Sequence, residues 1–418
     1  MHVSCTSHVK MVRVLTVEEA LEQILSRVVT LPAERVPLMD ALGRALAEPI
    51  VSRREIPPWA NSSMDGYAVR ATDTARVPAR LAVVATVTAG AMPSRAVGAG
   101  EAVRIFTGAP LPAGADAVIP QEDTEALDGH VTLKVSVDVG AYVRPRGEDL
   151  RVGDAVLTPG TALGPAEIGL LATLGHAQVL VYRRPRVAIL STGNELAELG
   201  REPGPGQIPN TNSYSLFAQV LESGAEPMNL GIATDELDAI EQRLRWGGAA
   251  DVLLSSAGVS VGDLDLVKTA LTRAGAELHL WQVSMRPGKP ITFGTLGSRA
   301  VFGLPGNPVS AMVTFELFVR PALRRMAGFS AIHRVRLRAR ALTPIPNPGF
   351  RRGYLRVTLE RLSNGSGWGA RLTGDQGSAI LTSMVRADGL AVVPGDTTIR
   401  AEDEVEVIVF RALALESV

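Results

Sequence analysis

The stretch Val187-Ala-Ile-Leu-Ser-Thr-Gly-Asn-Glu195 decides the fold class. An apolar run that leads directly into a small polar loop is typical of a buried parallel strand followed by a strand–helix turn. From Val187 to Gly328 strand and helix patterns alternate, which predicts a mostly parallel, doubly wound α/β sheet. The expected strands are Val187–Leu190, Met228–Ile232, Asp251–Ser255, Glu277–Val283 and Ala300–Phe302, and the expected helices are Asn212–Ser223, Glu236–Trp246, Leu264–Ala274 and Pro308–Met326.

The sequence changes character on both sides of this domain. Thr16-Val-Glu-Glu19 is a capping box that predicts a helix, and a second helix is expected over Leu38–Ala47. Residues 55–148 carry short β-type runs separated by Gly and Pro, which predicts a small β domain. After Gly328 the β pattern returns and predicts a small barrel or sandwich. The expected domains are an N-terminal helical scaffold (14–54 and 149–184), an inserted β domain (55–148), the α/β domain (185–329) and a C-terminal β domain (330–418).

Length and composition narrow the class of protein. A chain of 418 residues exceeds what one hydrophobic core organises, so several domains are expected. The net charge of −1 gives no basic field for nucleic acid. Cys5 is the single cysteine, so no disulfide forms within the chain, which favours a reducing compartment. No signal peptide or apolar run long enough to span a membrane is found, so a cytoplasmic protein without membrane contact is expected.

Three polar loops follow three strands of the α/β domain and open toward the same edge of the sheet. They begin at Ser191, Ser255 and Gly303. Ligands of open parallel sheets bind at the carboxyl ends of the strands, and Gly-rich helix starts favour phosphate. One such loop alone fits an ordinary strand–helix turn equally well; three together favour an anion-binding crevice. The predicted ligand-contacting residues are Ser191, Thr192, Gly193, Gly258, Ser260, Gly262, Gly306 and Asn307.

Charged candidates accompany these loops. Met285-Arg-Pro-Gly-Lys-Pro290 places two cations three residues apart across a rigid turn, which suits one oxyanion, although surface Lys and Arg are commonly just solvated. Carboxylates near a phosphate usually indicate Mg²⁺, whereas each alone is more often a cap or surface charge. Asp235, for example, could lie in the first turn of a helix capped by Thr234. The acidic candidates are Asp65, Asp149, Glu195, Asp235, Asp263 and Asp265.

Two common phosphate motifs are absent from the sequence. There is no Walker A loop and no Gly-x-Gly-x-x-Gly after the first strand. The six histidines are dispersed without metal-ligand spacing. A generic ATPase or dehydrogenase is therefore disfavoured.

The ordered motifs resemble the molybdopterin molybdenumtransferases, the family of the bacterial MoeA proteins and the gephyrin E-domain. Each motif is weak alone, but the set keeps the family order over nearly the whole chain. The matching pieces are Ser63-Met-Asp-Gly-Tyr-Ala68, Phe106-Thr-Gly-Ala-Pro-Leu-Pro112, Gly147-Glu-Asp149, Ser191-Thr-Gly-Asn-Glu-Leu196, Val259-Ser-Val-Gly262 with Asp265, Pro287-Gly-Lys-Pro290, Gly303-Leu-Pro-Gly-Asn-Pro-Val-Ser310 and Gly374-Asp-Gln-Gly-Ser378.

The resemblance implies a reaction and an assembly. Members take adenylylated molybdopterin and molybdate, release AMP, and leave molybdenum on the dithiolene sulfurs with Mg²⁺ assisting. It further implies that the α/β domain is molybdopterin-binding, that the protein is an elongated homodimer with its active cleft between subunits, and that a molybdopterin adenylyltransferase and apo-molybdoenzymes are partners.

Carried over residue by residue, the resemblance also implies site roles. The catalytic positions are Asp65, Thr107, Asp149, Glu195, Asp235 and Asp265, of which Asp65, Glu195 and Asp235 are the candidate Mg²⁺ ligands. The molybdate positions are Arg286, Lys289, Ser310, Arg352 and Ser378.

Two residues depart from the family pattern. Ala257 replaces a usual Gly and adds a methyl group, and Arg286 replaces a frequent Lys with a larger, forked cation. Neither change removes a carboxylate, so an active enzyme is expected. The alternatives are a peptide-binding scaffold of the gephyrin type and a generic Mg²⁺-dependent nucleotide hydrolase. The sequence does not distinguish molybdate from tungstate.

Overall fold

The computed structural model describes residues 14–256, 266–362, 365 and 367–411. The chain divides into two compact units. The first comprises Met1–Glu48, Pro159–Ile168 and Gln178–Val418, and the second comprises Pro49–Thr158 and Gly169–Ala177.

The first unit contains the predicted α/β sheet. Its six strands lie in the order β16-β13-β17-β21-β20-β18, and the four strands from β16 to β21 are parallel to one another. All five predicted strands are confirmed: β13 (Arg186–Thr192), β16 (Glu226–Ala233), β17 (Val252–Ser256), β18 (Glu277–Gln282) and β21 (Arg299–Leu304). The sequence did not predict β20 (Pro290–Leu296), which runs antiparallel between β21 and β18.

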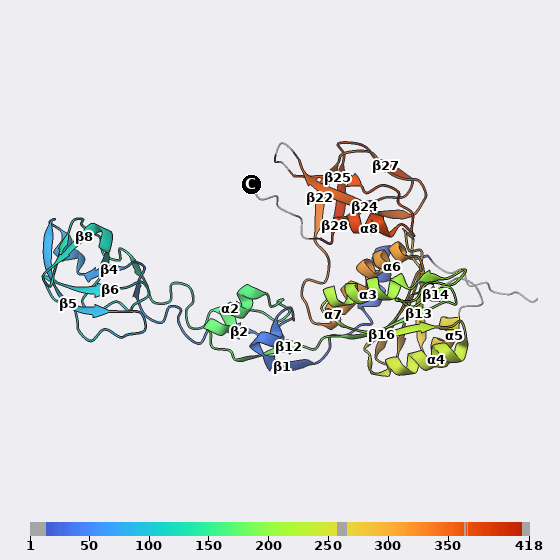
Figure 1. Ribbon diagram of the computed structural model, residues 1–418, viewed down its shortest axis with the longest axis horizontal. Coiled ribbons are helices and arrows are strands. Elements are labelled where there is room, and N and C mark those ends of the chain that lie inside the picture. Colours follow the sequence, from blue (N-terminus) through green and yellow to red (C-terminus); the bar gives the residue numbers. More distant parts are fainter. Residues whose placement is uncertain (1–13, 257–265, 363–364, 366, 412–418) are drawn as a thin grey trace, which may run out of the picture. The chain divides into compact units, whose positions relative to one another are not determined.

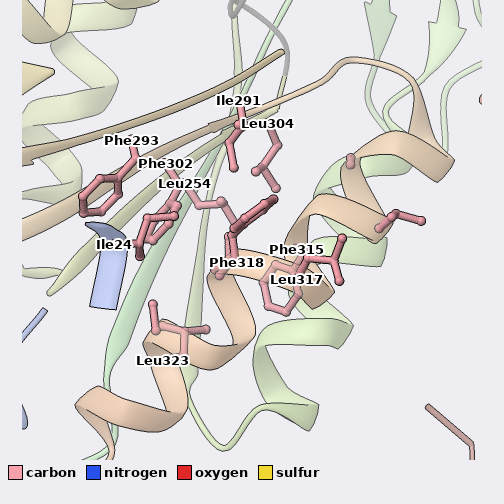
Figure 2. Packing of buried hydrophobic residues seen from close by; sticks show 14 of the residues in the cluster. Ile24, Leu254, Ile291, Phe293, Phe302, Leu304, Phe315, Leu317, Phe318 and Leu323 are labelled. Atoms are coloured by element: carbon pink, nitrogen blue, oxygen red, sulfur yellow. The ribbon is translucent and has the colours of Figure 1, made fainter. Parts of the chain in front are cut away.

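Helices cover both faces of this sheet (Figure 1). On one face α3 (Thr211–Glu222) and α6 (Pro308–Thr314) pack with α1 (Val17–Leu25) in the largest apolar core. Figure 2 shows Phe315 and Phe318 of this layer facing Phe302 and Leu254 of the sheet. On the other face α4 (Leu237–Trp246) and α5 (Leu266–Arg273) form a smaller core with Leu190 and Leu253. Burial on both faces explains why the strands are continuous apolar runs.

The helix expected over Pro308–Met326 is continuous but not uniform. It consists of α6, a π-helical turn at Phe315–Val319, and α7 (Arg320–Met326). A π-turn widens the helix by one residue per turn and so shifts the side chains that face the core. The turn contains Glu316, a carboxylate buried among arginines.

The region after residue 330 forms a closed five-stranded barrel. The strands β22 (Arg336–Ala341), β24 (Arg352–Arg361), β25 (Trp368–Leu372), β26 (Gly389–Val393) and β28 (Glu404–Val409) close through the pairing of β24 with β26. Of the two predicted architectures, the structure therefore has the barrel. The short strand β19 (Met285–Arg286) adds to β24 in parallel, and α8 (Leu381–Arg386) lies between β25 and β26 in the chain.

The N-terminal predictions had two outcomes. The capping box is confirmed, because the Thr16 hydroxyl accepts from the Glu19 backbone and the Glu19 carboxylate accepts from the Thr16 backbone. The second helix over 38–47 was wrong: only a 3₁₀ turn at Leu38–Ala41 forms. Gly43 adopts φ +74°, and the residues after it pair with Ala162 and Val181 instead of continuing a helix.

The second unit is built on a six-stranded sheet in the order β7-β4-β6-β5-β9-β8. The short β-type runs expected over residues 55–148 form strands of this sheet. Gly66 has no room for a side chain, because a Cβ atom would collide with the carbonyl of Ile119 on the neighbouring strand. The strands are β4 (Gly66–Val69), β5 (Ala79–Val87), β6 (Glu101–Ile105), β7 (Ala117–Pro120), β8 (Thr124–Leu127) and β9 (His130–Leu133).

Candidate active site

A cavity of about 470 Å³ lies at the carboxyl ends of the parallel strands. Its wall includes Glu195 after β13, Ser256 at the end of β17 and Asn307 after β21. The predicted crevice thus exists in the first unit. The other lining residues are Leu196, Ile208, Pro209, Asn210, Thr211, Asn212, Gly306 and Pro308.

A hydroxyl network supports this cavity from within. Ser191 is fully buried, and its Oγ lies 3.0 Å from Asn210 Oδ1, 2.8 Å from Ser213 Oγ and 2.9 Å from Ser256 Oγ. These bonds join β13, the start of α3 and the end of β17. The side chain of Ser191 therefore contacts protein groups that line the site, and its contact with a ligand stays a prediction.

Two asparagines in the wall were missed by the sequence reasoning. Asn210 caps α3 by accepting from Ser213 N at 3.3 Å, and Asn212 Nδ2 donates to the carbonyl of Gly306 at 2.7 Å. The Asn212 Oδ1 atom is buried and has no hydrogen-bond partner within the described residues. Asn210-Thr-Asn-Ser213 before an amphipathic helix is an N-cap signature, so the signal was available in the sequence. The N-termini of α3 and α6 thus both border the cavity, where their N–H groups favour an anion.

Glu195 and Asp235 occupy loops after neighbouring strands. Asn194 N donates to Asp235 Oδ2 at 3.3 Å, and Asp235 N donates to Asn194 Oδ1 at 3.2 Å, which ties the two loops together. Gly193 adopts φ +142°, and a Cβ there would collide with the Glu195 carboxylate. Both acidic side chains are exposed to solvent.

The alternative reading of Asp235 as a first-turn residue was wrong. Helix α4 begins at Leu237, its N-cap is Glu236, and no side chain caps it. Asp235 therefore lies before the helix, and Thr234 is not its cap.

The cationic turn packs against the start of the long helix. Gly288 adopts φ +101°, and a Cβ there would lie 2.6 Å from Thr314 Cγ2, so the turn approaches α6 closely at this point. Arg286 Nη1 donates to the carbonyl of Pro348 at 3.5 Å, while Lys289 is exposed. Ser310, on the same helix one turn before Thr314, is buried. The structure thus brings the turn with Arg286 and Lys289 to the helix that carries Ser310.

Ser378 reaches this helix from the barrel. Its Oγ accepts from Asn307 Nδ2 at 3.0 Å, and its carbonyl accepts from Val309 N at 3.1 Å. Asn307 lines the cavity, so the Ser378 loop is fixed directly to the cavity wall.

Arg352 already has a carboxylate partner. It forms an ion pair with Glu18 on α1. Burial lowers the pKa of Arg352, but the hydrogen bonds and charges of Glu18 and Tyr354 together outweigh it and hold the pKa above its ordinary value. A contact of Arg352 with molybdate therefore stays a prediction.

The second unit holds Asp65 and Thr107 together. Asp65 Oδ1 accepts from Thr107 N at 2.8 Å and from Thr107 Oγ1 at 2.7 Å. These two bonds from Thr107 hold the pKa of Asp65 below its ordinary value. Asp149 is exposed, and its backbone N–H donates to the carbonyl of Ile56 at 2.9 Å.

Several predicted residues lie outside the described part of the chain. These are Gly258, Ser260, Gly262, Asp263 and Asp265, together with the departure at Ala257. Within the described residues, no three His, Cys, Asp or Glu side chains gather to hold a metal ion. Over the same residues, no helix is both long enough and apolar enough to cross a membrane.

Comparison with protein families covers almost the whole chain. Residues 15–175 match the MoeA N-terminal region (domain I and II), residues 188–325 match a probable molybdopterin binding domain, and residues 338–410 match the MoeA C-terminal region (domain IV).

Individual relatives agree with these matches. A molybdopterin molybdenumtransferase of Nostoc sp. is 40% identical over 385 residues, covering 90% of this chain and 88% of the relative. One of Bacillus subtilis is 35% identical over 395 residues, covering 92% and 91%. Among solved structures, a molybdopterin biosynthesis MoeA protein of Pyrococcus horikoshii is 31% identical with a TM-score of 0.81 over 95% of this chain and 100% of that chain.

The family matches, the identities and the fold agree with the strand-end cavity and the ordered motifs. The chain belongs to the molybdopterin molybdenumtransferases, a transferase family of molybdenum cofactor biosynthesis.

Proposed function

We propose that the protein transfers molybdenum from molybdate to adenylylated molybdopterin, with release of AMP. The observation that carries the proposal is the cavity of about 470 Å³ at the strand ends, bordered by two helix N-termini and next to the loop that presents Ser378. The relatives of this chain in Nostoc sp. and Bacillus subtilis are named molybdopterin molybdenumtransferases. In the reaction, water breaks the phosphoanhydride bond of the substrate and AMP leaves. The two dithiolene sulfurs then bind the molybdenum of molybdate and displace one of its oxygens, which leaves as water with the two sulfur protons.

The residues of the first unit divide into two groups in this proposal. The N-termini of α3 and α6, with Asn212 between them, bind the pyrophosphate through N–H and amide groups. The cationic turn, Ser310, Arg352 and Ser378 bind the tetrahedral molybdate through charge-assisted hydrogen bonds. The pyrophosphate-binding group is supported by Ser191, Thr192 and Gly193. It is connected to the molybdate-binding group by Gly306 and Asn307.

The exposed carboxylates suit Mg²⁺. Glu195 and Asp235 are hard oxygen donors on adjoining loops, and Mg²⁺ is usually held by one or two carboxylates together with substrate phosphates. When bound, Mg²⁺ neutralises the pyrophosphate and polarises its phosphorus–oxygen bonds. In the second unit, Asp65 accepts two hydrogen bonds from Thr107, and we assign catalytic roles to Asp65 and Asp149 there.

The decisive experiment supplies the protein with adenylylated molybdopterin, MgCl₂ and molybdate. AMP release is followed by chromatography, and product is scored by activation of an apo-molybdoenzyme. We expect both signals from the wild type and the loss of both from Glu195→Gln. Glu198→Gln, an exposed carboxylate three residues away, is the matched control and should keep full activity. Absence of AMP release from the wild type would sink the proposal.

The two alternatives give different results in the same assay. A generic Mg²⁺-dependent hydrolase would release AMP or phosphate from ordinary nucleotides without molybdate. A peptide-binding scaffold would give no turnover, and Glu195→Gln would leave its binding unchanged. Replacing molybdate with tungstate in the same assay measures the preference between the two oxyanions.

The assembly is a separate proposal. We propose a cytoplasmic homodimer that receives its substrate from a molybdopterin adenylyltransferase and delivers its product to apo-molybdoenzymes. Sedimentation equilibrium tests the dimer: a mass of twice 44.1 kDa is expected, and a mass of 44.1 kDa at micromolar concentration would contradict it.

A further inference from the structure

A second cavity of the first unit lies at the opposite edge of the α/β sheet. Its wall is formed by α4 and α5, which lie side by side in Figure 1, and by the hairpin of β20 and β21, and it includes Arg245, Arg273 and Arg299. Arg299 begins β21, and the next residue, Ala300, pairs with Val252 at the start of the parallel strand β17. This amino-edge cavity is therefore separated from the strand-end cavity by the length of the strands.

The size and the floor of the amino-edge cavity suit a small organic molecule. Its volume is about 470 Å³, equal to that of the strand-end cavity, and small-molecule sites occupy about 300–1,000 Å³. Leu244 and Ala270 in its wall are buried, and Leu296 is half-buried. Gly248 leaves space at the wall, because a Cβ atom there would meet no other atom within 4 Å. The cavity therefore offers an apolar surface to the body of a ligand.

The charged residues of the cavity wall are not balanced. Arg245 Nη1 lies 3.8 Å from Glu241 Oε2, and Arg273 Nη1 lies 3.7 Å from Glu241 Oε1. Both distances are longer than a hydrogen bond, so one carboxylate is shared loosely by two arginines. Arg299 is half-buried and forms no side-chain hydrogen bond or ion pair with another described residue. The forked donors of all three arginines are thus available to an anion.

Helix dipoles explain only part of this cluster. Arg245 and Arg273 lie in the last turns of α4 and α5, where cations offset the negative end of a helix. Arg299 begins a strand and has no such role. Three arginines against one glutamate leave an excess of two positive charges in the wall. This excess, beside an apolar floor, indicates a ligand that carries two negative charges and an apolar body.

We propose that the amino-edge cavity is a second ligand site, which binds a small organic dianion. The phosphate or carboxylate oxygens of the ligand accept from Arg245, Arg273 and Arg299, and its apolar body packs on Leu244 and Leu296. The inference does not depend on the proposed function, because none of the residues assigned to the transfer reaction lines this cavity. A dianion bound here leaves the strand-end cavity free for substrate.

The probe for the test is 4-bromophenyl phosphate, a dianion with an apolar ring and an anomalous scatterer. Inorganic phosphate keeps the charge without the ring, and 4-bromobenzyl alcohol keeps the ring without the charge. 5-Bromoisophthalate replaces the phosphate with two carboxylates, so it distinguishes a diacid ligand from a phosphorylated one. Isothermal titration calorimetry measures the affinity of the full chain for each compound, and the bromine peak in crystals soaked with the probe gives its position.

Two variants of the cavity wall should act in opposite directions. Arg299→Gln removes a charged donor and should weaken probe binding by about tenfold. Glu241→Gln removes the carboxylate that competes for two arginines and should strengthen probe binding by about threefold. Arg186→Gln is the matched control, because Arg186 is an exposed arginine at the same edge of the sheet that pairs with Glu226 outside the cavity. This variant should bind the probe as the wild type does.

The wild type should bind 4-bromophenyl phosphate or 5-bromoisophthalate with a Kd below about 1 mM, with bromine beside Leu244 and Leu296. Equal affinity for 4-bromobenzyl alcohol or for inorganic phosphate would overturn the proposal, since either the charge or the ring would then contribute nothing. So would a bromine peak found only in the strand-end cavity, wild-type affinity in Arg299→Gln, or no gain in Glu241→Gln.

A folding defect in Arg299→Gln would not leave the proposal untested. The double variant Arg245→Gln/Arg273→Gln changes two largely exposed side chains, whose relative exposures are 68% and 62%, and should also weaken probe binding by about tenfold or more. Wild-type affinity in this double variant would contradict the proposed site. The assay for AMP release is separate, so failure of the transfer reaction and failure of this site are distinguished.

Discussion

Two regions of the first unit bury arginine side chains, and they differ in the groups that contact the positive charge. Around Glu316 two arginines contact a carboxylate of the chain: Arg334 Nε lies 2.9 Å from it and Arg320 Nε lies 3.9 Å from it, while Gln219 Nε2 donates to it at 2.9 Å. Around Arg356 the hydrogen-bond acceptors are the neutral Ser383 and Gly377. Removing the carboxylate of a buried ion pair leaves an uncompensated buried charge, whereas Arg356 has no contacting carboxylate to lose.

The comparison implies that the two regions should respond to different measurements. Mutations around Glu316 should change the free energy of unfolding in the absence of any ligand. Mutations at Arg356 should change how much an added oxyanion stabilises the protein.

Glu316→Ala should give the largest loss of stability, about 3–5 kcal/mol, because it leaves buried arginines without their carboxylate. Burial and the nearby Arg334 lower the pKa of Arg320 to about 10 even with Glu316 in place. Chemical denaturation measures the effect. Glu406→Ala, which removes an exposed partner of Arg336, is the control and should cost much less. A similar cost in both variants would contradict the comparison.

Asp251→Asn tests the ion pair between Asp251 and Arg183, whose side chains are partly exposed to solvent. Asp251 accepts from Arg183 Nη1 at 2.9 Å, from Arg183 Nη2 at 2.7 Å and from Arg186 N at 2.8 Å. We expect a loss of about 1–2 kcal/mol, reduced by solvent screening.

The pH dependence of this pair has a definite sign. Burial raises the pKa of Asp251, but the bonds from Arg183 and Arg186 outweigh it and leave the folded-state pKa lowered. The contribution is therefore complete above the unfolded pKa of about 3.9 and is lost as the pH falls through the lower folded value. Unfolding curves between neutral and acid pH should converge for wild type and Asp251→Asn at the acid end.

Arg356→Met should change the free energy of unfolding by less than about 1 kcal/mol in either direction, since lost hydrogen bonds offset the removal of a buried charge. In thermal-shift measurements, added molybdate should stabilise the wild type and have little effect on the variant. Equal shifts of the melting temperature in the wild type and in Arg356→Met would contradict the difference between the Glu316 and Arg356 regions.

Thr107→Val should give the smallest effect, a shift in the pKa of Asp65. The Asp65 carboxylate is held by two neutral donors of Thr107. The variant removes one of the two bonds that lower the pKa of Asp65, so the pKa should rise toward about 3.9. The acid limb of kcat/KM for AMP release should then move to higher pH. The conservative control Thr107→Ser should keep the wild-type acid limb of the pH profile. An unchanged acid limb in Thr107→Val would show that the ionisation of Asp65 does not control kcat/KM.

Patterns with a local physical cause were predictable from the sequence. The capping box at Thr16 needs only residues three apart, and the apolar runs of the α/β strands follow from burial on both faces. The strand-end cavity followed as well, because parallel topology places the loops after Ser191, Ser256 and Leu304 at one edge.

Features that depend on distant partners were not predictable. Arg356 stands in β24 among apolar residues, and nothing local tells that α8 and the Gly374–Ser378 loop cover it. The inward hydroxyl of Ser191 depends on residues up to 65 positions away. The short turn at Leu38 was mistaken for the start of a helix. Ala45 and Leu46 pair with Ala162 and Val181 instead, and this distant pairing overrides the local helical pattern.

The assembly of the first unit from separated segments has a consequence for synthesis on the ribosome. Helix α1 buries Ala20 and Ile24 against residues up to Met326, and Glu18 pairs with Arg352, 334 positions later. At about 5–20 residues per second, the ribosome needs about 15–60 seconds to supply those partners. During that interval the apolar face of α1 lacks these partners, so the nascent chain carries an uncovered apolar surface.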